Sequence, residues 1–415
     1  MKLLVIELNE FNYEILKKYS KKYNFKYLKK ILNFNHTKTT TKDVYLGDNN
    51  QHGYLDPWSQ WVSIHTLTGS KKHKIKNLGD IPKLKFKQIW ELKKNINFYI
   101  WGPMNATRRG SGNVKLFFPD PWVYSEKAYP ENLNKILKPI KKAIKNRGND
   151  SIFKKIIFIG SIISILAQYI GFFSVFKSIS QTLYDFIKFK KNYVFFCNWE
   201  YLCLQVLIKI IETKENFISI YFINSLAHVQ HHYWLKKKYS KEITYCLKYL
   251  DIMIKHIYKK KNFNILIING LSQRNAEKEE LCLYEQKSHS YLLRRLNINF
   301  YKIEKLMTND AFIFFKNKKD TLKCREILMS MKFKNKNIFH VQIIDDKKIF
   351  YKTNFIKKAK KNDLIFGNDC QLKFLDYFSF ITVRRGIHSQ NGDILSEKKI
   401  FPKKIENHNI FKYLK

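Results

Sequence analysis

Short apolar runs, three of them followed directly by asparagine, most constrain how this chain can fold. The runs are Lys2–Leu8, Asn97–Trp101, Phe217–Ile223 and Asn264–Ile268. Continuous apolar stretches of this length are typical of strands buried on both faces of a parallel sheet. Asn9 and Glu10 follow the first run and Asn224 follows the third. Because functional groups lie at the carboxyl ends of such strands, we expect these side chains to line a site. An Asx turn is the other interpretation of Asn9.

These runs predict an α/β fold, a doubly wound and mostly parallel sheet flanked by helices. With 415 residues and 45% apolar side chains, the chain can bury a large core. We expect the core to comprise residues 1–125, 195–300 and 365–415. A helical hydrophobic cap insertion is expected at 126–194, and a small peripheral α+β element at 301–364.

The segment Leu55–Asp80 contains a predicted short helix that begins at Ser59 and ends before Gly69. Pro57 favours a turn just before it, and Ser59 is a good N-cap residue. Backbone N–H groups at a helix N-terminus favour anions, so a serine there could attack phosphorus or sulfur. A serine that only caps the helix is the simpler interpretation.

This segment resembles the nucleophile segment of the alkaline phosphatase superfamily, and most closely its type I phosphodiesterase/nucleotide pyrophosphatase branch. In that branch a Thr or Ser opens a helix, a Thr-Gly pair closes it and His-Gly-Ile follows. Here Ser59, Thr68-Gly69 and His73-Lys74-Ile75 take those places, with Lys74 in place of the glycine. The resemblance implies that Ser59 is a nucleophile that forms a covalent intermediate.

The resemblance also assigns metal ligands, but with substitutions. The branch has Asp-x-x-x-His after a strand, and here Asn224 and His228 stand at those places. His388, in a glycine-bounded loop, fits a late histidine of the same metal site. Asn9 stands where the first strand usually ends in a metal-binding Asp. Each of these residues has a structural alternative, such as a loop histidine or an Asx turn.

Two further observations bear on the metal. His228 and His232 are four residues apart and share a helix face, a spacing that suits one metal or a plain surface cluster. An Asp-His pair expected after the strand Asn264–Ile268 is replaced by Gly270-Leu271. We therefore expect at most one divalent ion, zinc-like because of its histidine ligands.

Basic residues are abundant, with a net charge of +43. The lysines are spread along the chain with no nucleic-acid-binding signature, so a lysine-rich codon bias explains them first and an anionic partner second. Arg108 and Arg109, in a loop after Asn97–Trp101, could hold a phosphate or simply be solvated. We expect a small phosphorylated molecule, or a glycan or lipid phosphate, as the ligand.

Ile156–Phe176 is long and apolar enough to cross a bilayer. A span would separate the Ser59 segment from the His228 segment, which we expect in one site. We therefore expect a helical hairpin or cap, broken near Gly160 or Gly171, that touches an anionic membrane only peripherally.

The six cysteines show no disulfide or metal-finger spacing, and the N-terminal run is too short for a signal peptide. A cytoplasmic protein is expected, with a possible membrane association. The combined interpretation is a phosphodiesterase-like hydrolase or phosphotransferase. The alternatives are an inactive pseudoenzyme that binds a phosphorylated ligand, for instance in surface-glycan assembly, and a membrane-associated scaffold.

Overall fold

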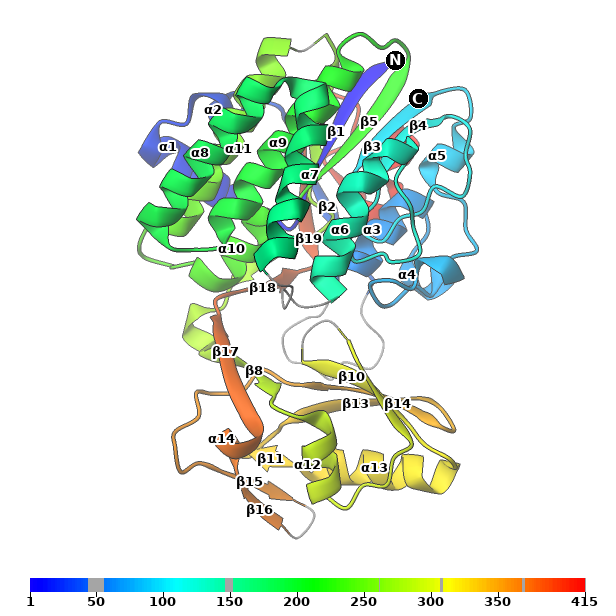
Figure 1. Cartoon of the computed structure of the whole chain (residues 1–415), viewed down its shortest axis with the longest axis vertical. Helices are drawn as coiled ribbons and strands as arrows, with labels where there is room; N and C mark the ends of the chain where they lie inside the picture. The colour runs from blue at the N-terminus through cyan, green and yellow to red at the C-terminus, as the bar shows by residue number, and fades with distance from the viewer. Residues whose placement is uncertain (44–55, 146–151, 261, 307–308, 368–369, 415) are drawn as a thin grey trace.

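A mostly parallel sheet lies at the centre of the larger part of the molecule (Figure 1). The computed structural model describes residues 1–43, 56–145, 152–260, 262–306, 309–367 and 370–414. Within these residues the sheet has eight strands in the order β20-β2-β19-β6-β1-β5-β3-β4. The strands are β1 (Lys2–Leu8), β2 (Asn35–Thr40), β3 (Asn97–Trp101), β4 (Val114–Phe118), β5 (Phe217–Ile223), β6 (Asn264–Ile268), β19 (Asn391–Ser396) and β20 (Lys404–Glu406). All four predicted strands have the bounds expected from the sequence, and the predicted α/β class is confirmed.

The register of the central strands brings their polar ends together. β1 pairs in parallel with β5, Leu8 opposite Ile223, and with β6, Glu7 opposite Ile268. The residues that follow these strands therefore lie together at the carboxyl ends of the strands. The backbone N–H of Asn9 donates to the carbonyl oxygen of Ile223 at 2.9 Å, which continues the pairing past the end of β1.

Helices cover both faces of the sheet, as the continuous burial of β1 requires. Leu4 and Ile6 pack in the hydrophobic cluster that contains α9 and α11, whereas Leu3 and Val5 pack with α3 and α5. The helices of this part are α1 (Tyr13–Tyr23), α2 (Lys26–Leu32), α3 (Pro57–Thr66), α4 (Ser70–His73), α5 (Ile89–Leu92), α6 (Asn134–Lys145), α7 (Ile152–Ile170), α8 (Phe172–Phe189), α9 (Tyr193–Ile211), α10 (Ser225–Tyr233) and α11 (Lys241–Lys260).

The hydrophobic run Ile156–Phe176 is divided between two helices that pack against each other, α7 and α8. The break is at Gly171, whose φ of +82° is a conformation that favours glycine. Gly160, the other predicted break, lies inside α7. One helix of the described chain, α9, is long and apolar enough to span a membrane by length and composition, and 56% of that window is buried inside the protein. Burial of this kind is typical of a core helix.

A smaller part of the molecule has its own hydrophobic core and antiparallel sheets (Figure 1). The buried members of that core run from Cys282 to Phe378, a wider range than the expected 301–364. Its elements are β8 (Leu281–Gln286), α12 (His289–Arg295), β9 (Lys302–Lys305), β10 (Asp310–Phe314), α13 (Lys318–Ser330), β11 (Lys332–Phe333), β12 (Lys336–Asn337), β13 (Phe339–Asp345), β14 (Lys348–Thr353), β15 (Leu364–Gly367), β16 (Cys370–Lys373), α14 (Phe374–Tyr377) and β17 (Phe378–Arg384). A separate two-stranded sheet is formed by β7 (Ser272–Asn275) and β18 (Gly386–Ser389).

Candidate metal centre

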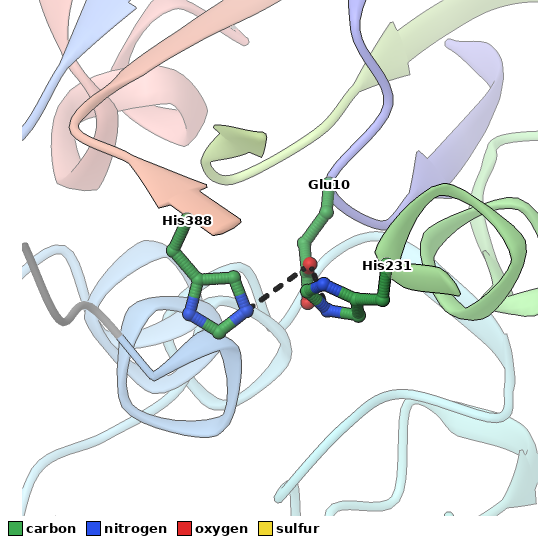
Figure 2. Close-up of side chains that lie close together, drawn as sticks. All are labelled: Glu10, His231 and His388. Atoms are coloured by element: carbon green, nitrogen blue, oxygen red, sulfur yellow. Dashed lines mark ion pairs between the residues drawn. The ribbon is translucent and has the colours of Figure 1, made fainter. Parts of the chain in front are cut away.

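Glu10, His231 and His388 bring one carboxylate and two imidazoles together near the carboxyl ends of β1 and β5 (Figure 2). Oε2 of Glu10 lies 2.9 Å from Nε2 of His231 and 3.2 Å from Nε2 of His388. The three candidate ligand atoms all lie within 4.8 Å of one another. The side chains are 3%, 7% and 11% exposed, so the cluster is largely shielded from water.

Three elements distant in sequence position these side chains. Glu10 follows β1 in a left-handed conformation, with φ of +53°, which turns its side chain at the end of the strand. His231 lies on α10, which begins directly after β5. His388 lies on β18, where it pairs with Gln273 of β7. Gln273 also donates to Oε2 of Glu10 at 2.6 Å, so the neighbouring strand fixes the carboxylate.

The hydrogen bonds of His231 identify which ring nitrogen carries a proton. Nδ1 lies 2.7 Å from the carbonyl oxygen of Gly386, and a carbonyl oxygen can only accept. Nδ1–H is therefore the donor, and in the neutral ring the lone pair of Nε2 points at the Glu10 carboxylate. Two electron pairs that face each other at 2.9 Å need a proton or a metal cation between them. A histidine whose other N–H donates to a backbone carbonyl is the usual arrangement of a metal ligand.

The electrostatics of the cluster favour an ionised Glu10 and a neutral His231. Burial alone would raise the pKa of Glu10, but His388 leads the causes that oppose burial, and that pKa is held well below its usual value. Burial, with Arg384 next in effect, lowers the pKa of His231 to about 3, although Glu10 acts in the opposite direction. A neutral imidazole is the form that binds a metal.

The donor set fits a divalent transition metal. Two imidazoles and one carboxylate are the protein ligands of several catalytic zinc sites, where a further position is left for water or substrate. Ligand atoms at about 2.1 Å from a tetrahedral ion lie about 3.4 Å apart. The separations of 2.9 and 3.2 Å are close to that value, and the third is within 4.8 Å.

Three other predicted site residues form a hydrogen-bonded chain next to this cluster. Nδ2 of Asn9 donates to Oδ1 of Asn224 at 2.7 Å, and Nδ2 of Asn224 lies 3.1 Å from Nε2 of His228. Oδ1 of Asn9 accepts from the indole N–H of Trp61 at 2.8 Å. The amide oxygens of both asparagines thus already hold hydrogen bonds.

Trp61 also lies where the Asp-His pair of the resemblance would stand. A Cβ added at Gly270 would meet two atoms of the Trp61 ring at 3.2 Å. Leu271, the second of the two positions, is fully buried in apolar surroundings. The indole therefore fills the space beside Gly270.

The helix that carries Ser59 begins earlier and ends earlier than expected. α3 runs from Pro57 to Thr66 with Asp56 as its N-cap residue, so Ser59 lies in the first turn and does not cap it. Leu67 ends the helix in a left-handed conformation, and Gly69 instead precedes α4. Leu55, the first residue of the predicted segment, lies outside the described residues.

Ser59 is 7% exposed, and its hydroxyl donates to the carbonyl oxygen of Ile75 at 3.0 Å. Residues two apart on a helix point to nearly opposite sides. Since Trp61 reaches Asn9, Ser59 faces away from that chain of amides.

The His73-Lys74-Ile75 motif ties the loop after α4 to α3. Nδ1 of His73 accepts from the Ile75 N–H at 3.0 Å, so Nε2 carries the proton and lies 2.9 Å from the Ser63 hydroxyl. Burial lowers the pKa of His73 to about 4, with Asp43 acting against it, which keeps the ring neutral. The Ser63 hydroxyl in turn donates to Asp43 at 2.7 Å. In this structure the motif forms hydrogen bonds that hold the loop against α3.

The remaining predicted residues make other contacts. Nδ1 of His232 lies 3.2 Å from the hydroxyl of Thr382, so this ring is not among the three of the metal cluster. Arg109 donates to the carbonyl oxygen of Phe86 at 3.0 Å. The Arg108 guanidinium lies over the ring of Tyr129, 3.6 Å from its centroid.

Sequence reasoning did not select Glu10 or His231 as ligands. Glu10 was expected only to line the site, since the resemblance concerns its neighbour Asn9. The segment His228–His232 holds three histidines, and i,i+4 spacing favoured the outer two. The signal that could have identified His231 is the i,i+3 spacing from His228, which also places residues on one helix face.

Comparisons with known proteins concern the fold. No protein-family model matches the sequence, and no curated protein sequence matches it. The structure is similar to human ectonucleotide pyrophosphatase/phosphodiesterase 5, with a TM-score of 0.47 and 10% identity over 100% of this chain and 94% of that chain. For phosphonoacetate hydrolase from Sinorhizobium meliloti 1021 in complex with phosphonoformate the TM-score is 0.45, with 8% identity over 99% and 94%. For a TAB5 alkaline phosphatase mutant with Mg bound it is 0.39, with 10% identity over 100% and 96%.

All three are members of the alkaline phosphatase superfamily, which the sequence resembles.

Proposed function

We propose that this protein is a metal-dependent phosphoester hydrolase or phosphotransferase, with one divalent transition metal held by Glu10, His231 and His388. The observation that carries the proposal is the Nε2 lone pair of His231, held by the Gly386 hydrogen bond so that it points at the Glu10 carboxylate. When bound, such an ion withdraws charge from a phosphoryl oxygen and lowers the pKa of bound water.

The chain's own residues contribute orientation and charge. Gln273 fixes the Glu10 carboxylate, and Gly386 fixes the tautomer of His231. Arg384 is close enough to lower the pKa values of His231 and His232. A guanidinium next to the cluster supports an anionic substrate. The proposed substrate is a phosphorylated small molecule or a glycan or lipid phosphate.

Ser59 is retained as the proposed nucleophile on the sequence resemblance. In the structure its hydroxyl donates to Ile75, so attack on phosphorus would require that bond to break. The resemblance implies metal-binding roles for Asn9, Asn224 and His228. Their hydrogen-bonded chain lies next to Glu10, since Nδ2 of Asn9 also contacts Oε1 of Glu10 at 3.2 Å.

The test compares two adjacent histidines on α10. Purified protein is loaded with zinc, cobalt or manganese, freed of excess metal, and assayed with bis-p-nitrophenyl phosphate and p-nitrophenyl phosphate. We expect His231→Ala to lose bound metal and turnover together, and His232→Ala, the matched control, to keep both. Equal metal content and activity in the two variants would contradict the assignment.

One observation favours a second candidate function, a binding protein without turnover. Trp61 and Asn224 already engage both ends of the Asn9 amide, and the space beside Gly270 is filled. One bound ion without hydrolysis of either ester, together with inorganic phosphate binding measured by calorimetry, would support this function over the enzyme.

We also propose a cytoplasmic location. The six cysteines show no disulfide spacing in the sequence, which is the pattern expected in a reducing compartment.

A further inference from the structure

The outer face of α8 carries four exposed apolar side chains, two near each end of the helix. The exposed fractions are 82% for Phe173, 58% for Phe176, 63% for Tyr184 and 73% for Ile187. Successive spacings of three, eight and three residues place these side chains along one side of a helix. Exposed apolar patches of this kind mark interaction sites on otherwise soluble proteins.

The opposite face of α8 is fixed to the protein. Val175, Ser178 and Asp185 are buried, and the Asp185 carboxylate accepts from the hydroxyls of Tyr245 and Tyr249 at 2.8 and 3.1 Å. Because these bonds hold the helix in one orientation, the apolar face cannot rotate inward without losing them. The face is therefore a rigid part of the surface.

Lysines surround this face. Lys177 and Lys188 are exposed on α8, and Lys190 and Lys191 follow its end. A helix with an apolar face bordered by lysines is the pattern of a helix that lies in a membrane interface, where lysines near an anionic leaflet strengthen binding. We propose that α8 docks on an anionic lipid surface, with Phe173, Phe176 and Ile187 entering the headgroup boundary.

Aromatic contacts connect α8 with His228, beside the candidate site. Phe186 of α8 contacts Phe195, with ring centroids 4.7 Å apart. The next residue, Phe196, is 52% exposed and stacks on the His228 ring with a centroid distance of 6.1 Å. Docking through α8 would thus bring the His228 side of the site near lipid headgroups. Only this consequence rests on the proposed function; docking itself does not.

The test is sedimentation of the full-length protein with vesicles of equal parts phosphatidylglycerol and phosphatidylcholine, and with pure phosphatidylcholine vesicles. We expect binding to the anionic vesicles only. The double variant Phe173→Ser/Ile187→Ser should bind at least about tenfold more weakly. It removes two apolar side chains that would be buried in the headgroup boundary of the membrane. Tyr301→Ser/Ile344→Ser, which changes exposed apolar residues of the smaller part, is the matched control and should bind as the wild type does.

A charge series separates a specific face from the general excess of lysine. Lys177→Glu/Lys188→Glu should weaken binding more than Lys336→Glu/Lys361→Glu, a pair of exposed lysines in the smaller part. Equal losses in both pairs, or no vesicle binding at all, would overturn the proposal. So would a dimer, seen by analytical ultracentrifugation, that Phe173→Ser/Ile187→Ser separates, because the face would then be covered by a second copy. None of these readouts needs catalysis, so an inactive protein leaves the docking result interpretable.

Discussion

Trp61 donates its indole N–H to Oδ1 of Asn9 at 2.8 Å, and the same ring lies against Gly270. Asn9 and Gly270 are two positions that the superfamily resemblance assigns to a second metal. The Trp61 side chain thus hydrogen-bonds to the amide oxygen of Asn9 and fills the space beside Gly270. A carboxylate pair that would offset the charge of a second cation is also missing at these positions, and close cations without such charge repel strongly. Among the described residues, the side chains that could hold a metal ion are grouped instead at Glu10, His231 and His388.

We predict one tightly bound transition-metal ion per chain by elemental analysis. Glu10→Gln retains a similar shape but removes the negative charge, so the metal dissociation constant should rise by about a hundredfold or more. His228→Ala is the informative control, because the sequence resemblance makes it a ligand and the structural cluster does not. Retention of the ion in His228→Ala supports the Glu10, His231 and His388 site. If His228→Ala loses the ion and Glu10→Gln retains it, the metal ligands would be Asn224 and His228 instead.

We predict that Gly270→Ala lowers the free energy of unfolding by about 1–3 kcal/mol, because overpacking against the Trp61 ring adds to the cost of a side chain at φ of +69°. Gly160→Ala is the control. Gly160 lies within α7 with nothing within 4 Å of its added Cβ, so alanine there should be neutral or stabilising by up to about 1 kcal/mol. Urea unfolding followed by tryptophan fluorescence measures both changes. Equal stabilities would show that the ring can move away from Gly270.

The strands could be predicted because burial on both faces leaves continuous apolar runs, and β1, β3, β5 and β6 have the bounds that those runs indicate. The start of α3 was misplaced since Asp56, Pro57 and Ser59 are all acceptable at a helix N-terminus, and local preference does not choose among them.

The metal cluster depends on features that no local pattern contains. Glu10 reaches it through a left-handed backbone conformation, which is uncommon for a residue other than glycine. His388 reaches it because β18 pairs with β7, more than a hundred residues earlier in the chain, in a register that places it opposite Gln273. The Trp61 contact with Gly270 likewise joins segments far apart in sequence. These are tertiary relationships, so the sequence could place the site at the strand ends and indicate His388 without choosing Glu10 or His231.

We predict that Ser59→Ala abolishes hydrolysis of bis-p-nitrophenyl phosphate and leaves the bound metal in place, if Ser59 is the nucleophile. Ser59→Thr should restore part of the activity, since it returns a hydroxyl that the superfamily also uses. Loss of the hydrogen bond to Ile75 should lower the free energy of unfolding by about 1 kcal/mol in the alanine variant.

The matched control for Ser59 is Ser63→Ala, which removes another buried hydroxyl from α3. It breaks contacts with Asp43 and His73, so it should destabilise the protein without a specific loss of turnover. Full activity in Ser59→Ala would exclude a serine nucleophile at this position.

The last prediction concerns Glu200, which holds the start of α10. Oε1 of Glu200 accepts from the backbone N–H groups of Asn224 and Ser225 at 2.7 and 2.8 Å. Burial raises its pKa from 4.5 to about 7, and hydrogen bonds from Ser225 and Asn224 only partly oppose that rise. Since the folded state then binds a proton more tightly than the unfolded state, the contribution of Glu200 to stability is present below about pH 4.5 and is lost as the pH rises toward 7.

Glu200→Gln should remove this dependence, because a neutral amide can accept the same hydrogen bonds at every pH. The free energy of unfolding of the wild type minus that of the variant should fall steadily between pH 4.5 and 7 and be constant on either side. Urea unfolding of both proteins across this range measures the difference, and groups that titrate alike in both proteins cancel from it. A difference that rises with pH would mean that the carboxylate is stabilised in the folded state. Glu200 would then act as a charged cap at the N-terminus of the helix that carries His231.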